Sequence, residues 1–454
     1  MAVKNEIIRL EITAVTSEGN GVGRYEGMAV FVPQTAVGDV IEARLVKICP
    51  RYAYGRLEKL LSPSSDRVQP DCPVFHLCGG CSLRHVDYPA ELRIKRRLAL
   101  DAFVHIGGFP ETVCQKIVGS SRVNGYRNKA MYPVRREGEE IRIGFYRRRT
   151  HEVVDAAGCL LQPPEFSQIA GVLRQFLKET NVSCYDERTG KGLLRHLYLR
   201  RAEVTGQIMV CLVLNGARLP HAERFLALLD GLPFSIETVV LNENRKNTNV
   251  ILGEHTTVLR GSGKISDLLC GVRVELSPES FYQVNHDAAE QLYRYAGQCA
   301  GLNGSQTLLD LYCGAGTIGL SMAGTLRALI GVEVVPQAVE NARRNAQENG
   351  IENARFLCAD AEKAAAQLKR EGVRPDVAVV DPPRKGCSSQ TLETLADMQP
   401  SRIVMISCNP ATAARDCRLL EKMGYPLQSV TPFDLFPRTM HVETVCLLSK
   451  LKAE

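Results

Sequence analysis

The residues best suited to chemistry fall in short polar clusters in the last third of the chain. Gly314 follows the apolar run LLDLYC, Asp381 follows PDVAVV, and Cys408 follows RIVMIS. Apolar runs of this length that end in turns are typical of parallel strands in an open α/β sheet, which binds ligands at the carboxyl ends of its strands. We therefore expect these side chains to meet along one edge of a sheet.

The glycines Gly314, Gly316 and Gly319 indicate a nucleotide-type cofactor, because glycine lets the backbone turn sharply and approach a ligand closely. Glu333 ends the next apolar run, ALIGVEVV, where such folds bind ribose hydroxyls. The G-x-G-x-x-G spacing also fits NAD(P). A dehydrogenase, however, needs neither the DPPRKG turn nor the cysteine of SCNP, whereas a methyltransferase that attacks a pyrimidine ring needs a rigid polar turn and a nucleophile. We therefore favour S-adenosylmethionine over NAD(P).

Four motifs in this order resemble those of the RNA uracil-C5 methyltransferases, which form 5-methyluridine in ribosomal and transfer RNA: DLYCGAG, DPPRKG, SCNP and FPRTMHVET. The resemblance covers nearly the whole chain. It implies a Rossmann-like class I methyltransferase sheet over residues 263–454. The N-terminal half favours the 23S ribosomal RNA branch, and transfer RNA is the alternative substrate.

The resemblance also implies covalent catalysis. Uracil C5 is too weak a nucleophile to attack a methyl sulfonium, but a thiolate added at C6 turns C5 into an enolate carbon. Cys408 is the expected nucleophile, and Glu443 is the expected base for the C5 proton. A free thiol has a pKa of ~8.5, so a nearby cation must favour the thiolate. Arg384 and Lys385 are the candidates.

Further residues are expected around the cofactor. In the family the FxQVN motif places its glutamine, here Gln283, on the cofactor, while Asn285 is expected only to cap a helix. Glu333 is expected on the ribose and Asp360 near the adenine. Asp381 would position the uracil or the amino-acid part of the cofactor. The remaining expected contacts are Tyr312 and Thr317; Thr317-Ile318 stands where some relatives have Asn-Phe, which leaves that contact open.

A cysteine cluster predicts an inorganic centre. Cys72, Cys78 and Cys81 lie close together around a Gly-Gly turn, and such a group can wrap one centre. In the family these three, with the distant Cys159, hold a 4Fe–4S cluster, which we expect here. Zinc is the alternative, although Cys₄ zinc sites usually use paired CxxC units and the second unit is missing.

The N-terminal residues predict a separate β domain. Residues 1–60 alternate apolar and polar positions between turns, as in a small all-β barrel of the OB type. The segment GNGVGRYEGMAVFVPQTAVGD resembles a TRAM domain, an RNA-binding barrel; a barrel without a partner is the alternative. Its basic residues would face an RNA backbone: Arg24, Arg44, Lys47, Arg51 and Arg56. The segment LSPSSDRVQPD indicates a linker.

Residues 61–262 are expected to form a mixed α+β RNA-binding domain that carries the cysteine site. The helical segment 87–109 is expected to pack on the catalytic domain, with Arg93, Lys95, Arg96 and Arg97 on a solvated face. The basic stretch from Arg122 to Arg149 suits single-stranded RNA, because cations are interleaved with aromatic residues; a solvated β face is the alternative. These aromatic residues are Tyr126, Tyr132, Phe145 and Tyr146.

Composition limits the class of protein. The formal charge of +6 permits an acidic polymer as partner. No apolar run approaches the ~20 residues of a membrane span, and the N-terminus lacks a signal-peptide core, so we expect a cytoplasmic protein. The sixteen cysteines, scattered through core-like strands, fit a reducing compartment. We expect a monomer with no obligate protein partner.

Two other activities fit parts of the sequence. An amino-group methyltransferase also uses a Pro-Pro turn, but an aromatic residue usually follows it, and here Arg384 follows. A non-catalytic RNA-binding or assembly protein could keep the fold, but intact Cys408 and Glu443 argue against this alternative.

Overall fold

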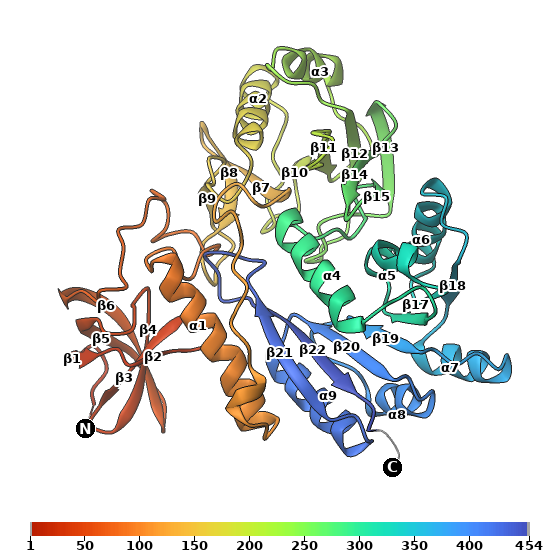
Figure 1. Cartoon of the computed structure of the whole chain (residues 1–454). Coiled ribbons are helices and arrows are strands. Elements are labelled where there is room, and N and C mark those ends of the chain that lie inside the picture. The colour runs from red at the N-terminus through yellow and green to blue at the C-terminus, as the bar shows by residue number, and fades with distance from the viewer. Residues whose placement is uncertain (1, 452–454) are drawn as a thin grey trace.

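The computed structural model describes residues 2–451, which form three large sheets and one small hairpin (Figure 1). The N-terminal sheet has the order β1-β5-β6-β4-β3-β2. Its strands are β1 (Ile7–Glu11), β2 (Ala14–Val15), β3 (Asn20–Tyr25), β4 (Met28–Pro33), β5 (Val40–Ile48) and β6 (Tyr52–Ser62). Alternate residues such as Ile8, Leu10 and Ile41 fill its core, which confirms the expected all-β N-terminal fold.

Helix α1 (Tyr88–Asp101) connects the N-terminal sheet with the C-terminal part of the chain. Asp87 caps it by accepting a hydrogen bond from the Ala90 backbone N–H at 2.7 Å. The helix packs on β21 and α9, and the following turn η1 (Ala102–Ile106) packs on α9. In Figure 1 the orange helix lies between the red N-terminal strands and the blue C-terminal strands. One more short turn, η2 (Glu111–Val113), contacts β21.

The central sheet has the order β13-β12-β11-β10-β7-β8-β9. Strands β10 and β11 pair antiparallel, with Leu197 opposite Leu212. Helix α2 (Pro164–Thr180) packs on helix α3 (Ala222–Asp230) beside this sheet. The strands are β7 (Lys129–Glu137), β8 (Glu140–Tyr146), β9 (Val153–Asp155), β10 (Leu194–Arg201), β11 (Ile208–Leu214), β12 (Thr238–Glu243) and β13 (His255–Arg260).

The C-terminal sheet has the order β18-β17-β16-β19-β20-β22-β21. The chain enters at its centre, runs out to β18 and returns to β19, so the strand order reverses between β16 and β19. Open α/β sheets bind ligands at this reversal. The strands are β16 (Thr307–Leu311), β17 (Ala328–Glu333), β18 (Ala354–Cys358), β19 (Val377–Val380), β20 (Arg402–Ser407), β21 (Leu427–Phe433) and β22 (Glu443–Ser449). The antiparallel pair β21–β22 forms a hairpin at the sheet edge.

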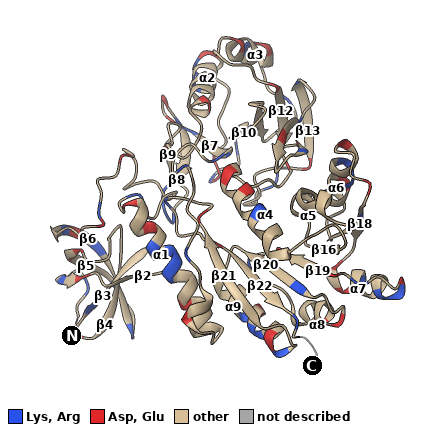
Figure 2. Cartoon of the chain, in the orientation of Figure 1, with Lys and Arg blue, Asp and Glu red and all other residues tan. Residues whose placement is uncertain are grey.

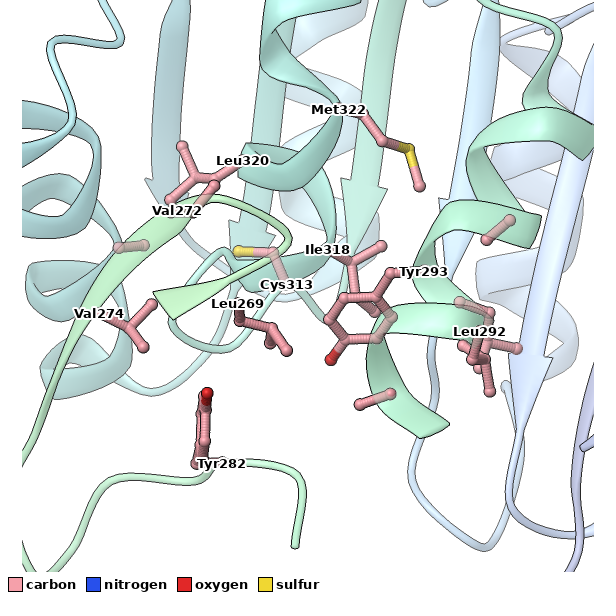
Figure 3. Packing of buried hydrophobic residues seen from close by; sticks show 14 of the residues in the cluster. Leu269, Val272, Val274, Tyr282, Leu292, Tyr293, Cys313, Ile318, Leu320 and Met322 are labelled. Atoms are coloured by element: carbon pink, nitrogen blue, oxygen red, sulfur yellow. The ribbon is translucent and has the colours of Figure 1, made fainter. Parts of the chain in front are cut away.

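Helices on both faces cover the C-terminal sheet (Figure 1). They are α4 (His286–Ala300), α5 (Thr317–Met322), α6 (Pro336–Glu348), α7 (Ala361–Arg370), α8 (Ser389–Asp397) and α9 (Pro410–Lys422), with a short turn η3 (Ala323–Thr325) after α5. A hairpin of β14 (Ile265–Leu269) and β15 (Val272–Leu276) packs beside α5 and α6. Figure 3 shows its apolar side chains beside Tyr293 of α4 and Ile318 of α5, which belong to the same core.

Acidic and basic residues are interspersed over all parts of the fold (Figure 2). Among residues 2–451, none of the helices is both long enough and apolar enough to cross a membrane.

Candidate active site

Three neighbouring strands bring the two expected catalytic residues together. Strands β20 and β22 pair antiparallel with Ser407 opposite Thr444, and continuing this register by one residue places Cys408 opposite Glu443. The Thr444 hydroxyl also donates a hydrogen bond to the Ser407 carbonyl at 3.2 Å. Asp381 follows β19, the strand on the other side of β20. The carboxyl ends of β19 and β20 and the start of β22 therefore share one edge.

The charges at this edge act on one another. Glu443 is 7% exposed, and burial together with the charge of Asp381 raises the pKa of its carboxyl to about 8, while Arg384 opposes the shift. Burial raises the pKa of Asp381 to about 7. A carboxyl with a pKa near neutrality can accept a proton and release it again, which is the requirement for a general base.

Cys408 is partly buried, and burial and Glu443 raise the pKa of its thiol. Arg384 lowers that pKa through its charge and a side-chain hydrogen bond to Cys408. Of the two cations that the sequence suggested, Arg384 is therefore the one that acts on the thiol. It contacts the nucleophile and also counters the charge of Glu443.

The start of α9 fixes the Arg384 turn. Asn409 caps α9 by accepting a hydrogen bond from the Ala411 N–H at 3.1 Å, and its amide donates to the Arg384 carbonyl at 3.0 Å. One turn later Arg415 donates to the carbonyls of Lys385 and Cys387, at 3.0 and 3.2 Å. The asparagine of SCNP thus positions DPPRKG relative to the thiol that precedes it.

The glycine turn after β16 lies next to the end of β17. Gly314 and Gly316 have φ of +54° and +77°, which favours glycine, and Gly316 precedes α5. Glu333 accepts hydrogen bonds from the N–H groups of Gly314, Val334 and Val335, at 3.2, 2.8 and 2.9 Å. An ordered carboxylate beside an open glycine turn fits a nucleotide ribose.

The other expected cofactor residues divide into two groups. Gln283 and Thr317 both hydrogen-bond the buried Tyr293 hydroxyl, Thr317 at 3.5 Å, so the structure brings these two together. The Tyr312 side chain instead hydrogen-bonds Thr391 and Cys387. Asp360 caps α7 through the Lys363 N–H at 2.9 Å and is ion-paired with the Lys363 side chain.

The sequence reasoning missed Asp310, the first residue of DLYCGAG. Its side chain is fully buried, one oxygen accepts a hydrogen bond from the Gly319 N–H at 2.9 Å, and the other has no hydrogen-bond partner in the described structure. Burial raises the pKa of Asp310 to about 7. The available signal was a carboxylate inside an apolar strand, which is costly without a function or a partner. Asn285 caps α4 as predicted, and its amide also donates to the Leu435 carbonyl at 3.0 Å.

The four cysteines of the predicted inorganic centre line one cavity of about 240 Å³, together with Phe75 and Arg127. Burial raises the pKa of the Cys78, Cys81 and Cys159 thiols, that of Cys81 to about 12. Within residues 2–451, no three His, Cys, Asp or Glu side chains converge as ligands of a single metal ion. The fold thus brings the distant Cys159 to the other three cysteines, around a shared space.

The predicted RNA-stacking residues of the central domain are partly wrong. Tyr126 and Tyr132 are fully buried, because their rings fill apolar cores, and cannot stack on bases. Several of the basic residues are ion-paired, such as Arg122 with Glu203 and Asp287. A cluster of partly exposed aromatic residues lies on the N-terminal sheet. It comprises Phe31, Tyr52 and Tyr54, whose ring centroids are 5.6 to 5.7 Å apart.

Comparison with known proteins finds two domain families, each matching part of the chain, and relatives that match nearly all of it. The TRAM domain family matches residues 3–57, and the family described as tRNA (Uracil-5-)-methyltransferase matches residues 265–451. An uncharacterized RNA methyltransferase of Halalkalibacterium halodurans is 41% identical over 446 residues, which cover 98% of this chain and 97% of the relative. A second from Staphylococcus aureus is 39% identical over 448 residues, 98% of both chains.

One solved structure resembles the whole chain. The crystal structure of the Pyrococcus abyssi tRNA (uracil-54, C5)-methyltransferase in complex with S-adenosyl-L-homocysteine matches with a TM-score of 0.78 and 27% identity. It covers 97% of this chain and 100% of its own. These matches define an RNA methyltransferase with an N-terminal TRAM domain. The chain belongs to the RNA (uracil-5-)-methyltransferase family.

Proposed function

We propose that this protein methylates C5 of a uridine in RNA, with Cys408 as nucleophile and Glu443 as base. The observation that carries the proposal is the register of β20 and β22, which sets the thiol opposite a buried carboxyl whose pKa is near neutrality. Arg384 at the thiol supplies the positive charge that favours the thiolate.

The reaction follows from these positions. The Cys408 thiolate adds to C6, and the electron pair of the C5–C6 double bond makes C5 nucleophilic. S-adenosylmethionine would supply the methyl group: as C5 bonds to the methyl carbon, the bond from that carbon to sulfur breaks and S-adenosyl-L-homocysteine leaves. Glu443 then accepts the C5 proton, the electrons of that C–H bond restore the C5–C6 double bond, and the bond from C6 to sulfur breaks to release the thiolate. A target base within a folded RNA must leave its stack to reach these groups.

The residues around the glycine turn fit S-adenosylmethionine. Glu333 would hold the ribose, Gln283 and Thr317 meet at Tyr293, and Asp381 would orient the uracil or the cofactor. Tyr312 and Asp360 have other partners in this structure, so nothing in it supports their expected cofactor contacts. The solved relative carries S-adenosyl-L-homocysteine, which supports the same cofactor here.

Trapping of the covalent adduct tests the mechanism. Cys408→Ala should abolish methylation and any protein–RNA bond. Glu443→Gln should allow addition and methyl transfer but block proton removal, so methylated RNA should stay bonded to Cys408. This species should appear on denaturing gels as a slow band that requires S-adenosylmethionine. A normal turnover rate in Glu443→Gln would move the role of base to Asp381, and a band in Cys408→Ala would disprove the nucleophile.

We propose 23S ribosomal RNA as the substrate, because the N-terminal TRAM domain and the cysteine site resemble those of that branch of the family. The tRNA alternative is supported by the solved relative from Pyrococcus abyssi, a tRNA (uracil-54, C5)-methyltransferase. Mass spectrometry of RNA from a deletion strain decides between them. Loss of 5-methyluridine from 23S RNA supports the first substrate, and loss from tRNA alone supports the second.

We further propose that Cys72, Cys78, Cys81 and Cys159 hold a 4Fe–4S cluster. The four thiols surround a single cavity, and four cysteine thiolates are the usual ligands of such a cluster. The cavity wall includes Arg127, whose guanidinium lies 6.0 Å from the centre of the Phe436 ring in the connection that leads to Glu443. The centre would have a structural role, because its cysteines supply no group to the uracil chemistry.

A further inference from the structure

The connection between β21 and β22, residues 434–442, is held by side chains from the other end of the chain. Phe433 and Glu443 close this connection as the last pair of the hairpin. Within it, Asp434 is 1% exposed and accepts a hydrogen bond from Lys95 Nζ at 2.6 Å. Lys95 also donates to the Phe436 carbonyl at 3.0 Å and to Glu91 at 2.7 Å.

Lys95 is fully buried, contrary to the solvated face predicted for this part of α1. Arg93 and Arg97 are exposed as expected, with side chains 61% and 62% exposed. The difference has a physical cause. The ammonium of Lys95 has two carboxylates and a carbonyl as acceptors, and a buried charge is retained only when it is paired in this way.

Two more residues on the same face of α1 contact the connection. Tyr88 donates a hydrogen bond to the second oxygen of Asp434 at 3.0 Å. Glu91 accepts one from the Arg438 N–H at 2.7 Å, where Arg438 has a φ of +71°. Positions 88, 91 and 95 recur every three to four residues and so share one side of a helix. A non-glycine residue in the left-handed region persists only where surrounding contacts fix it.

Helix α1 therefore holds the connection from Asp434, next to the Phe433–Glu443 pair, to Arg438, and Cys408, which directly follows β20, lies outside it. Resting on the function proposed above, we propose that Lys95 is a positioning residue for Glu443. By fixing Asp434 and Phe436 it holds the hairpin end where the base meets the C5 proton. Loss of Lys95 then affects proton removal and release of the adduct, and leaves the addition step largely intact.

Single-turnover kinetics on the full chain test this inference. RNA and S-adenosylmethionine are mixed with excess enzyme, and the covalent band is followed on denaturing gels as it forms and disappears. In Lys95→Met the rate of band disappearance should fall about tenfold or more, and its formation should change less than about threefold. The band should therefore accumulate, as in a weaker form of Glu443→Gln.

Two further variants keep the result independent of general destabilisation. Asp39→Asn breaks another buried ion pair, with Arg67 in the N-terminal part, and should leave the ratio of the two rates unchanged. Tyr88→Phe removes the hydrogen bond to Asp434 and the one that the hydroxyl accepts from the Ser120 N–H, without leaving a charge unpaired, and should slow the same step by a smaller factor. If Lys95→Met does not fold, the test rests on Tyr88→Phe: slower release of the adduct supports the inference, and a wild-type rate of release overturns it.

The outcomes separate the two proposals. A wild-type rate of adduct release in a folded Lys95→Met, or an equal fall of both rates, overturns the role of Lys95 and leaves the covalent mechanism standing. If no variant gives a band, Glu443→Gln included, the covalent mechanism is wrong and this inference falls with it.

Discussion

At the residue scale, burial raises the pKa of three carboxyl groups, and Arg384 opposes this change at Glu443 and at the Cys408 thiol. Asp381, Asp310 and Glu443 all have raised pKa values because each carboxyl is taken out of water. Arg384 is the group that works in the opposite direction on Cys408 and Glu443. A single arginine therefore favours both the thiolate for addition and the carboxylate for proton removal.

Removing this arginine should make the nucleophile weaker. Arg384→Met is expected to raise the pKa of Cys408 further, because the remaining neighbours are carboxyl groups. Iodoacetamide labelling of the Cys408 peptide, followed by mass spectrometry from pH 6 to pH 10, should show a profile moved to higher pH by about one unit. Lys385→Met is the matched control and should give the wild-type profile. Identical profiles in Arg384→Met and wild type would remove Arg384 from this role.

Glu443 should cost stability wherever it is ionised. Its pKa of about 8 in the folded protein lies above the ordinary value of 4.5. The stability that the protonated carboxyl preserves is therefore fully present below pH 4.5 and is lost as the pH rises through 8. Glu443→Gln should therefore exceed wild type in unfolding free energy at pH 9 by on the order of 2 kcal/mol, with a smaller difference at pH 5. Urea unfolding at both pH values measures this. The exposed Glu340→Gln should show no such pH dependence, and an equal gain at both pH values would contradict the assignment.

At the scale of elements, the parallel strands could be predicted because each is a buried apolar run that ends in a turn. β19 and β20 are examples, and the candidate residues Asp381 and Cys408 were found directly after the ends of these two strands. The role of Asp310 was missed because a single carboxylate inside a strand carries no periodic signal. Lys95 was assigned to solvent because its acceptor Asp434 lies 339 residues away, and local spacing cannot reveal such a partner. Tyr126 and Tyr132 were misjudged because segments outside the basic stretch bury them: Tyr126 hydrogen-bonds the Pro437 carbonyl, and Tyr132 packs in the core of the central sheet.

The loops around the cysteine cavity give a prediction at this scale. Protein purified without oxygen should be brown and contain about four iron and four sulfide per chain. Cys159→Ser should lose most of this iron, whereas Cys49→Ser, which changes a cysteine outside the cavity, should keep it. Visible absorbance together with iron and sulfide analysis measures both. Stoichiometric zinc without visible absorbance would refute the proposed cluster.

At the scale of the whole molecule, we propose that the surface for RNA includes parts of both the N-terminal and the central sheet. The Arg149 guanidinium lies 5.8 Å from the centre of the Tyr54 ring, so the basic turn of the central sheet meets the aromatic surface of the N-terminal sheet. Cations beside open aromatic rings suit unpaired nucleotides, because phosphates and bases are bound together. The two parts of this surface should affect binding differently.

The salt dependence of RNA binding distinguishes the contribution of the basic turn from that of the aromatic residues. Replacing Arg147, Arg148 and Arg149 together with Met should flatten the slope of log affinity against log salt by roughly 0.7 for each phosphate that is no longer neutralised. Tyr52→Ala should instead weaken binding at every salt concentration by about 1–3 kcal/mol with an unchanged slope, because stacking releases no counterions. Fluorescence anisotropy with a labelled RNA measures both. An unchanged slope in the arginine variant would mean that these three arginines do not neutralise RNA phosphates and form an ordinary solvated surface.

The pairing of Lys95 with Asp434 also sets an order of assembly during translation. At common elongation rates, the 339 residues between them take on the order of tens of seconds to synthesise. During that time Lys95 has only Glu91 of its own helix as a carboxylate partner and lacks both Asp434 and the Phe436 carbonyl, so it is less well suited to burial. The contacts between α1 and the connection therefore form only after the ribosome has synthesised the final hairpin. The positioning of Glu443 is then one of the last folding events of the nascent chain.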